Sequence, residues 1–292
     1  MLKEVKRVLI IGSGTMGEQI ALQILKNNYT VYLYDNSKDN LFTCKSKIEQ
    51  NTTLEQSEKL FITENLTEIS DKVDLVIETV TENLKVKKEL FRKLNTLFPK
   101  EVIFVTNTSD LLPSWMAKDS GREEYFCAYH FHAPMYGADI VDIMPHSKTS
   151  IDTIKSLKIF TKRIKLIPLV LKKENPGYIY NTILNSIMDS SIKLVIKGVA
   201  EIEDVDRAWM GNTGMKIGPF GMLDLIGIDT AMNVSIIKAK KNILSYIGAA
   251  FFKKFVKNGK LGIKTGEGFY KYPNPKYQDE NFLRDAKSYL KN

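Results

Sequence analysis

Several residue types are scarce in this sequence, and each shortage excludes a class of protein. Two cysteines, Cys44 and Cys127, among 292 residues cannot supply a disulfide framework or a cysteine-based zinc site, so we expect no bound metal and a reducing, cytoplasmic location. No uncharged apolar run approaches the roughly 18 residues of a membrane span, and the N-terminus leads directly into an expected strand. We therefore expect no membrane association and no targeting segment.

The positive charge of the chain is spread along its length. Lysine and arginine number 42 against 34 acidic residues, which gives a formal net charge of +8 without any single basic block. Dispersed lysines are typical of solvated helix faces, so we expect no nucleic-acid partner, whereas a basic surface suits an acidic small molecule such as a nucleotide or a coenzyme A thioester. The length and the 43% hydrophobic content predict two folded domains.

The beginning of the chain carries a dinucleotide-binding pattern. An apolar run at 8–11 leads into a G-x-G-x-x-G motif and a helix-like stretch, and a second apolar run at 31–34 ends at Asp35. Such glycines allow a tight turn, close approach of the backbone to a pyrophosphate, and packing of helix on strand. The helix N-terminus adds unpaired N–H groups for the phosphates. The residues expected at the pyrophosphate are Gly12, Gly14, Thr15, Met16 and Gly17.

Asp35 indicates which dinucleotide binds. A carboxylate at the end of the second strand can accept hydrogen bonds from the adenosine ribose hydroxyls and would repel a 2′-phosphate. The sequence therefore predicts NAD rather than NADP, although Lys38, just past that strand, is a cation of the kind that can receive a 2′-phosphate.

Strand and helix patterns alternate as far as residue 174, and only helical periodicity follows. We therefore predict an α/β fold, in which a Rossmann-type, doubly wound NAD-binding domain over 1–174 precedes an all-helical substrate and dimerisation domain over 175–292. The surplus of apolar helix suggests a homodimer, and the alternative is that these helices simply cover the first domain. The expected strands are 73–78, 102–105 and 165–171, and the expected helices are 37–50, 84–97, 151–163, 179–196, 203–210, 220–226 and 230–257.

Two of the three histidines mark the candidate catalytic site. A hairpin-like pair of strands would set Asp142 beside His130, the arrangement in which a carboxylate holds an imidazole in one tautomer and stabilises its protonated form. We expect His130 and His132 to face opposite sides of their strand, so that only one enters the site. His146 is expected at the surface.

Short motifs in a fixed order complete the pattern. After the glycine motif they are DLVIE at 74–78, ENLKVK at 82–87, NTS at 107–109, His130-Phe131 with Pro134, PGYI at 176–179 with Asn181, GPF at 218–220 with Leu223-Asp224 and GIDT at 227–230, and KTGEGFY at 264–270. With them the chain resembles the short-chain L-3-hydroxyacyl-CoA dehydrogenases, including the bacterial 3-hydroxybutyryl-CoA enzymes of fatty acid metabolism, along nearly its whole length.

The resemblance implies a role for each candidate site residue. His130 resembles the general base, and Asp142 occupies the place of the family's glutamate that orients it. Ser109 and Asn181 resemble the polar groups that hold the reacting oxygen, with Ser109 also near the nicotinamide. Positions that resemble cofactor contacts are Glu82, Lys87 and Asn107.

The chain departs from the family near the expected substrate. The segment 36–73 is too short for the family's helical hairpin that helps hold coenzyme A. Asp110 replaces a second serine, His132 and Ala133 replace the Phe-Asn of a His-Phe-Phe-Asn-Pro motif, Asp142 is one methylene shorter than glutamate, and Thr182 replaces an arginine.

These departures leave three functions open. The favoured substrate is a short-chain 3-hydroxyacyl-CoA. The first alternative is a free 3-hydroxy acid, as in the related carnitine and L-gulonate dehydrogenases. The second is a non-catalytic NAD-binding structural protein, against which the joint presence of His130, Asp142, Ser109 and Asn181 argues.

Overall fold

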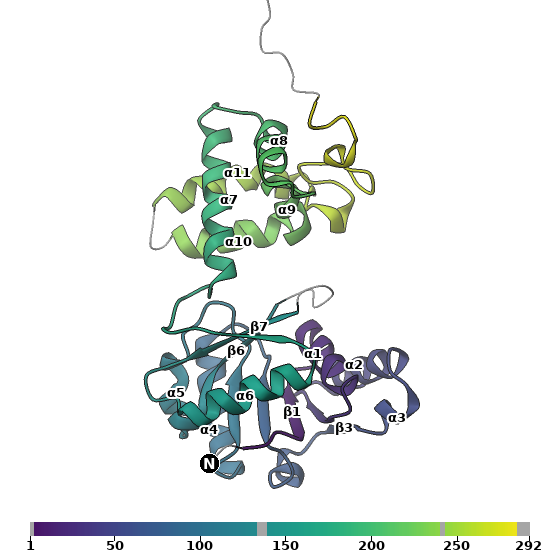
Figure 1. Ribbon diagram of the computed structural model, residues 1–292, viewed down its shortest axis with the longest axis vertical. Helices are drawn as coiled ribbons and strands as arrows, with labels where there is room; N and C mark the ends of the chain where they lie inside the picture. The colour runs from purple at the N-terminus through teal and green to yellow at the C-terminus, as the bar shows by residue number, and fades with distance from the viewer. Residues whose placement is uncertain (1–2, 133–138, 240–242, 285–292) are drawn as a thin grey trace, which may run out of the picture. The chain divides into compact units, whose positions relative to one another are not determined.

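The computed structural model describes residues 3–132, 139–239 and 243–284. The chain forms two compact units, unit 1 over Met1–Ile179 and unit 2 over Tyr180–Asn292 (Figure 1). They separate a few residues after the boundary predicted at 174. Among the described residues, none of the helices is both long enough and apolar enough to cross a bilayer.

Unit 1 is built on an eight-stranded sheet with the order β3-β2-β1-β4-β5-β6-β7-β8. Neighbouring strands are parallel except β6 and β7, which are antiparallel. The predicted α/β, Rossmann-type fold is confirmed. The strands are β1 Arg7–Ile11, β2 Thr30–Tyr34, β3 Leu60–Thr63, β4 Leu75–Glu78, β5 Ile103–Thr106, β6 Phe126–Phe131, β7 Ile140–Pro145 and β8 Ile167–Val170.

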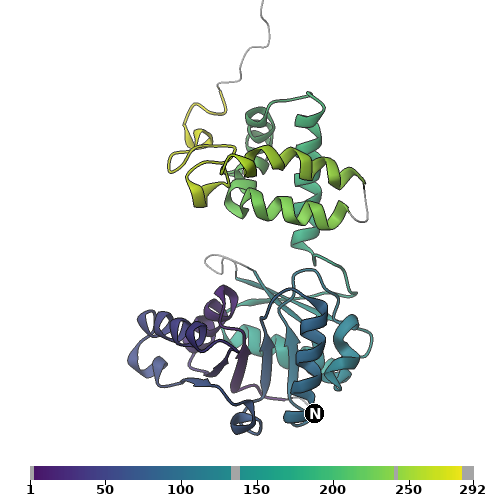
Figure 2. The same ribbon diagram turned by 180° about the vertical axis from the view of Figure 1, so that it is seen from behind.

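Helices cover both faces of this sheet (Figures 1 and 2). Residues alternate between the faces along each strand, so Val8 and Ile10 of β1 pack with α1, α2 and α6, whereas Leu9 and Ile11 pack with α4 and α5. The helices are α1 Thr15–Leu25, α2 Lys38–Gln50, α3 Leu54–Ser57, α4 Leu84–Leu97, α5 Ser114–Ser120 and α6 Ile151–Arg163, with 3₁₀ turns η1 Leu66–Ile69 and η2 Glu123–Tyr125.

The strand order positions the site. The chain runs outward from β1 to β2 and β3, returns to β4 on the other side of β1, and continues outward to β5 and β6. Ligands in such sheets bind beyond the carboxyl ends of the strands at the point where the direction reverses. The register brings the ends of β1, β2, β4 and β5 level, because Ile11 pairs with Tyr34 and Glu78, and Glu78 pairs with Thr106.

Unit 2 is helical, and its core is rich in aromatic side chains. Phe220, Phe252 and Phe282 are buried in it together with Met188 and Ile192. A single helix was expected over 230–257, but the structure has two helices there, α10 and α11, which pack on each other. The elements are α7 Tyr180–Ile196, α8 Ile202–Thr213, α9 Pro219–Ile226, α10 Ile228–Ala239, α11 Ile243–Lys257, η3 Ile263–Thr265 and η4 Lys276–Gln278.

Two buried aspartates explain the glycine motifs of unit 2. Asp206 accepts hydrogen bonds from the backbone N–H groups of Phe220 and Gly221, and Asp224 accepts them from Phe269 and Tyr270. A Cβ on Gly218 would lie 2.4 Å from Asp206 Cγ. The glycine therefore lets α9 approach the carboxylate closely.

Unit 2 should lose stability as the pH rises. Burial raises the pKa of Asp206 to about 6, so the folded state binds this proton more tightly than the unfolded chain does. The free energy of unfolding should then fall between about pH 4 and about pH 6, by at most about 3 kcal/mol. Urea unfolding of Asp206→Asn should lack this component of the pH dependence, while Asp189→Asn, at an exposed site in α7, should follow the wild type.

Candidate active site

The glycine turn after β1 has the geometry that a pyrophosphate site needs. Gly12 has φ +107°, and a Cβ on Gly17 would lie 1.9 Å from the Gly12 carbonyl oxygen, so neither position accepts a side chain without strain. A Cβ on Gly14 would meet nothing within 4 Å, which leaves the backbone open to a ligand. Gly14 also supplies no side-chain cap to α1, so the first N–H groups there can bind an anion.

Asp35 lies beside this turn and is held by it. Its carboxylate accepts hydrogen bonds from the backbone N–H and the hydroxyl of Ser13, at 2.7 and 2.8 Å, and from the N–H of Ser37 at 2.9 Å. Partial burial favours a higher pKa, but these bonds outweigh it and hold the pKa of Asp35 below its usual value. The carboxylate is thus ionised and fixed beside the glycine turn, and its contact with the ribose stays a prediction.

Replacing Asp35 should change cofactor preference. We expect Asp35→Ala to weaken NAD binding more than NADP binding, because it removes an acceptor for the ribose hydroxyls and a charge that repels a 2′-phosphate. Fluorescence titration with NADH and NADPH measures both dissociation constants. Asp39→Ala, the same charge change at an exposed position in α2, should alter neither. Equal losses for the two cofactors in Asp35→Ala would refute the ribose assignment.

A buried ion pair supports the next part of the edge. Glu78, at the end of β4, and Lys87 of α4 are both fully buried and lie 2.6 Å apart. Burial raises the pKa of Glu78, and the Lys87 ammonium offsets part of that rise. Lys87 also lies 3.3 Å from Glu82. Its side chain is therefore placed to hold these two carboxylates, and the cofactor contact implied for it by the resemblance stays a prediction.

Glu82 orients the loop that follows β5. Its carboxylate accepts hydrogen bonds from the hydroxyl of Thr108 and from the backbone N–H groups of Ser109 and Asp110. The side chain of Asn107 acts on the neighbouring strand instead, because its oxygen accepts the N–H of Phe131 at 2.8 Å. Glu82 and Asn107 therefore lie near the edge of the sheet where the cofactor is expected. Each of them holds a segment of backbone close to His130.

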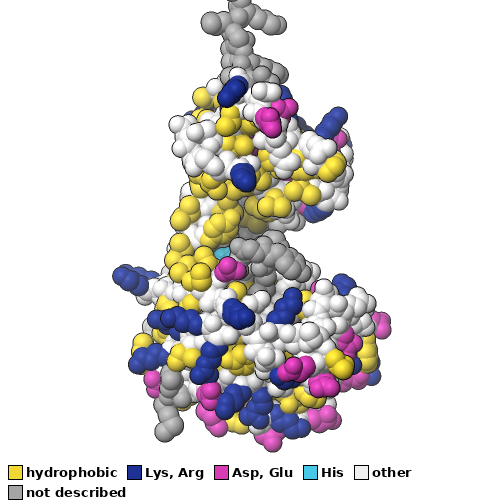
Figure 3. All heavy atoms as spheres, turned by 45° about the vertical axis from the view of Figure 1, so that its right-hand side comes forward, with side chains coloured by type: hydrophobic (Ala, Val, Ile, Leu, Met, Phe, Trp, Pro, Cys, Tyr) yellow, Lys and Arg dark blue, Asp and Glu magenta, His cyan; other side chains and the backbone are white. Residues whose placement is uncertain are grey.

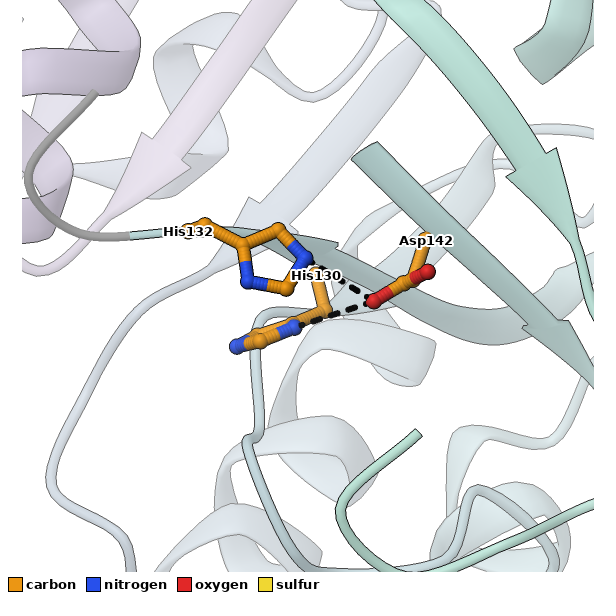
Figure 4. A group of neighbouring side chains, drawn as sticks. All are labelled: His130, His132 and Asp142. Carbon is orange, nitrogen blue, oxygen red and sulfur yellow. Dashed lines mark hydrogen bonds and ion pairs between the residues drawn. The ribbon is translucent and has the colours of Figure 1, made fainter. Parts of the chain in front are cut away.

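The predicted hairpin of β6 and β7 is confirmed, and it pairs His130 directly with Asp142. His130 Nδ1 lies 3.6 Å from Asp142 Oδ2, while His132 Nε2 lies 2.9 Å from the same oxygen (Figure 4). The expectation that the two histidines face opposite sides is wrong, since residues two apart in a strand share a face. Both imidazoles therefore lie against one carboxylate.

Ser109 and Tyr178 complete the surroundings of His130. Ser109 Oγ lies 3.3 Å from His130 Nε2, so the serine and the carboxylate face opposite ring nitrogens. The Tyr178 ring stacks on the imidazole, with centroids 4.5 Å apart, and its hydroxyl donates to the Thr108 carbonyl at 2.7 Å. These contacts fix the orientation of the imidazole plane.

Burial lowers the pKa of the His130 imidazole below its ordinary value, and the Asp142 carboxylate offsets only part of the shift. The two neighbouring imidazoles hold the pKa of Asp142 low despite its own burial. The arrangement is therefore an ionised carboxylate beside an imidazole that is neutral near pH 7. That is the protonation state a general base requires.

The remaining predictions from the sequence concern Asn181, the segment after His132, and His146. Asn181 lies at the start of α7 in unit 2, and its predicted contact with the reacting oxygen stays a prediction. Ala133 and Pro134 lie outside the described residues. The surface position expected for His146 is wrong, since the residue is 6% exposed and its Nε2 donates to the Glu123 carbonyl.

The sequence analysis missed the roles of Tyr178 and Glu78. Tyr178 has φ +51°, and it follows Pro176-Gly177, the motif that returns the chain to His130. Glu78 is the last residue of a strand that is otherwise apolar, and this position could have indicated a buried acid. A buried acid needs a cationic partner, and Lys87, one helical turn inside α4, was the candidate.

The fold, the glycine turn and the imidazole–carboxylate pair at the same edge of the sheet are typical of a dinucleotide-dependent oxidoreductase, and Asp35 beside the turn fits NAD. The sequence matches the family model described as 3-hydroxyacyl-CoA dehydrogenase, NAD binding domain, over residues 7–174, and the model of the C-terminal domain of the same family over residues 177–272. The chain belongs to the 3-hydroxyacyl-CoA dehydrogenase family. It is an NAD-dependent dehydrogenase that acts at a 3-hydroxy group.

Similar proteins cover nearly the whole chain. Hydroxyacyl-coenzyme A dehydrogenase, mitochondrial, from Sus scrofa is 34% identical over 92% of this chain and 91% of its own. A probable 3-hydroxybutyryl-CoA dehydrogenase from Deinococcus radiodurans is 30% identical over 90% and 99%. A solved diketoreductase, described as acting on dicarbonyl compounds, is 31% identical over 92% and 100%, with a TM-score of 0.86.

Proposed function

We propose that the protein transfers a hydride between NAD and C3 of a short-chain 3-hydroxyacyl-CoA, such as 3-hydroxybutyryl-CoA, with His130 as the general base. The proposal depends mainly on one observation: Ser109, His130 and Asp142 lie in contact, in this order, at the carboxyl edge of the sheet. One ring nitrogen of His130 faces a hydroxyl and the other faces a carboxylate. An imidazole that faces a carboxylate with one ring nitrogen has its other nitrogen available for the substrate.

The proton transfers follow from this geometry. With its proton on Nδ1, toward Asp142, His130 presents the lone pair of Nε2 to the substrate hydroxyl. The hydroxyl proton passes to Nε2 while the C–O single bond becomes a C=O double bond and hydride leaves C3. NAD, when bound, supplies the acceptor for that hydride. Asp142 stabilises the imidazolium that results.

Ser109 would bind the reacting oxygen, because its hydroxyl lies against the same nitrogen that receives the proton. We include Asn181 in this role on the strength of the family motif. Donors fixed at an oxygen that gains negative charge in the reducing direction stabilise the transition state without reorganisation. The loop that carries Ser109 is held by Glu82, so the donor is set in place before substrate binds.

A second substrate class, a free 3-hydroxy acid, is favoured by one observation. Between β2 and β3 the chain forms α2 and the single-turn helix α3, which leaves no long helical hairpin for coenzyme A in this segment. One similar protein is a diketoreductase described as acting on dicarbonyl compounds. We favour the thioester because the family and the mitochondrial and bacterial relatives carry hydroxyacyl-CoA names.

Initial rates of NADH oxidation separate the two classes. We expect the protein to reduce acetoacetyl-CoA with a kcat/KM well above that for acetoacetyl-pantetheine, which keeps the thioester and lacks the nucleotide. Free acetoacetate should be the poorest substrate. Equal rates with the two thioesters would mean that the nucleotide is not recognised. Turnover of free 3-hydroxybutyrate, carnitine or L-gulonate, measured in the opposite direction as NAD reduction, without turnover of either thioester, would establish the alternative.

We also propose a homodimer through unit 2. Exposed hydrophobic side chains gather on the face of unit 2 seen in Figure 3. The exposed apolar residues of this unit include Ile183 and Leu194 of α7 and Val234 and Ile236 of α10. Patches of this kind on helices are typical of protein interfaces. A role in fatty acid metabolism and a cytoplasmic location stay predictions, and the similar vertebrate proteins are named mitochondrial.

A further inference from the structure

The three residues drawn in Figure 4 have a property that the dehydrogenase reaction does not need. One ligand atom from each of His130, His132 and Asp142 lies within 4.8 Å of the other two. We propose that these side chains form a binding site for a divalent transition metal of the Zn²⁺ type, and that the bound metal inhibits the enzyme. The inhibition, but not the binding, rests on the proposed function.

The distances suit a small cation. Asp142 Oδ2 is 2.9 Å from His132 Nε2 and 3.6 Å from His130 Nδ1. Donors on a tetrahedral zinc, with bonds of about 2.0–2.1 Å, lie roughly 3.3 Å from one another. The two measured separations lie on either side of that value. Small shifts of the His132 ring and the Asp142 carboxylate would bring the donors onto one ion, while the His130 ring keeps its place.

The donor set selects the class of metal. Two imidazoles and one carboxylate bind Zn²⁺, Co²⁺ or Fe²⁺, whereas Mg²⁺ and Ca²⁺ prefer oxygen ligands throughout. Three protein ligands leave a fourth position for water. His132 supplies the second imidazole where the family motif has phenylalanine, so this donor set belongs to the present sequence.

The surroundings also fit a ligating imidazole. His130 Nδ1 is buried and makes no hydrogen bond within the described residues, since Asp142 Oδ2, at 3.6 Å, lies beyond hydrogen-bond distance; a buried polar atom in that state calls for an explanation. The other nitrogen, Nε2, lies 3.3 Å from the Ser109 hydroxyl, which can accept its N–H. Metal-bound histidines are held in this way by a partner on the second nitrogen. Tyr178 stacks on the ring and fixes its plane.

Metal binding and base catalysis would exclude each other. A metal on Nδ1 takes that lone pair, so the remaining ring proton must sit on Nε2. Nε2 then donates to Ser109 and cannot accept the proton of a substrate hydroxyl. The same ion removes Asp142 from its orienting role. We therefore expect reversible inhibition by Zn²⁺, relieved by a chelator.

Direct binding tests the site without turnover. The full-length protein, freed of metal by a chelator and dialysed, is titrated with Co²⁺ and followed by its ligand-field absorption, and Zn²⁺ stoichiometry is measured by equilibrium dialysis. We expect one ion per chain. His132→Phe and Asp142→Asn should each weaken binding by about 100-fold or more, since even outer-shell changes cost about 10- to 100-fold. Asp110→Asn, an acid at the same edge of the sheet, should bind as the wild type does.

The outcomes separate the two proposals. Absence of saturable Co²⁺ binding, or wild-type affinity in both His132→Phe and Asp142→Asn, would overturn the metal site and leave the proposed function intact. His132→Gln, which keeps a polar side chain, and circular dichroism of every variant guard against misfolding. In assays with the substrate, the Zn²⁺ concentration for half-inhibition should rise by about 100-fold in His132→Phe. Binding of Co²⁺ by a protein that turns over no substrate would retain the site and reject the base.

Discussion

His130→Ala should lose nearly all turnover while its affinity for NADH stays within a few-fold of the wild type. The imidazole is the group that accepts the substrate proton, and a positioned base contributes about 10²- to 10⁴-fold to rate. Asp35 and the glycine turn follow β2 and β1, whereas His130 lies in β6, and the Asp35 carboxylate is held by Ser13 and Ser37. Steady-state NADH oxidation and NADH fluorescence titration measure the two quantities on the same preparation.

Asp142→Asn provides the graded comparison. It keeps the shape of the side chain but removes the charge that stabilises the imidazolium, so its loss should be smaller than that of His130→Ala. Turnover by His130→Ala within about 10-fold of the wild type would remove His130 from the mechanism, since a base contributes more than that. A parallel loss of NADH binding would instead indicate a folding defect.

Lys87→Met should destabilise unit 1 severely. The ammonium lies 2.6 Å from Glu78, and both side chains are shielded from solvent. Removing one partner of a buried ion pair costs about 3–5 kcal/mol, because the remaining charge is left without compensation. Lys85→Met, an exposed lysine two positions earlier in α4, should change the free energy of unfolding by less than about 0.5 kcal/mol. Urea unfolding at neutral pH compares the two.

The double variant Glu78→Gln, Lys87→Met tests what Lys87 does. Neutralising both partners should recover most of the stability, because no buried charge remains. NADH affinity in this folded variant then decides the cofactor prediction. A large loss would mean that the ammonium acts on the cofactor, and wild-type affinity would assign it to the support of Glu78 and Glu82. A single variant Lys87→Met as stable as the wild type would contradict the buried pair.

The order of elements in unit 1 could be predicted from the sequence because local patterns determine it. Apolar runs, the glycine motif and the amphipathic stretch at 84–97 each depend on neighbouring residues, and α4 has the predicted bounds. The pairing of His130 with Asp142 followed from a short hairpin between two clear strands. The strand expected over 165–171 is shorter, Ile167–Val170, because an apolar pattern does not show where hydrogen bonding to a neighbour ends.

Contacts between distant segments could not be predicted in the same way. Tyr178 stacks on His130, 48 positions earlier in the sequence, and Asp206 accepts a hydrogen bond from Phe220 at the start of α9. Only the folded backbone brings these groups together. His132 was misplaced for a simpler reason, the two-residue period of a strand. That error hid the shared carboxylate, on which the metal site depends.

The scattered positive charge suits a small anionic ligand. Lys and Arg side chains are spread over the face of unit 1 in Figure 3 rather than collected in one block. A field of this kind attracts anionic small molecules without forming a binding surface for a polymer. NAD carries such a charge, and so does the acyl-CoA thioester that we propose as substrate.

Transfer of an isotope tests the central claim most directly. The protein is incubated with acetoacetyl-CoA and NADH that carries deuterium on the transferable position of the nicotinamide, and the product is examined by mass spectrometry. The account predicts 3-hydroxybutyryl-CoA with one deuterium on C3, formed at the rate of NADH oxidation. NADH oxidation without deuterium on C3, or no consumption of the thioester by protein that binds NADH, would contradict hydride transfer to a 3-oxoacyl-CoA.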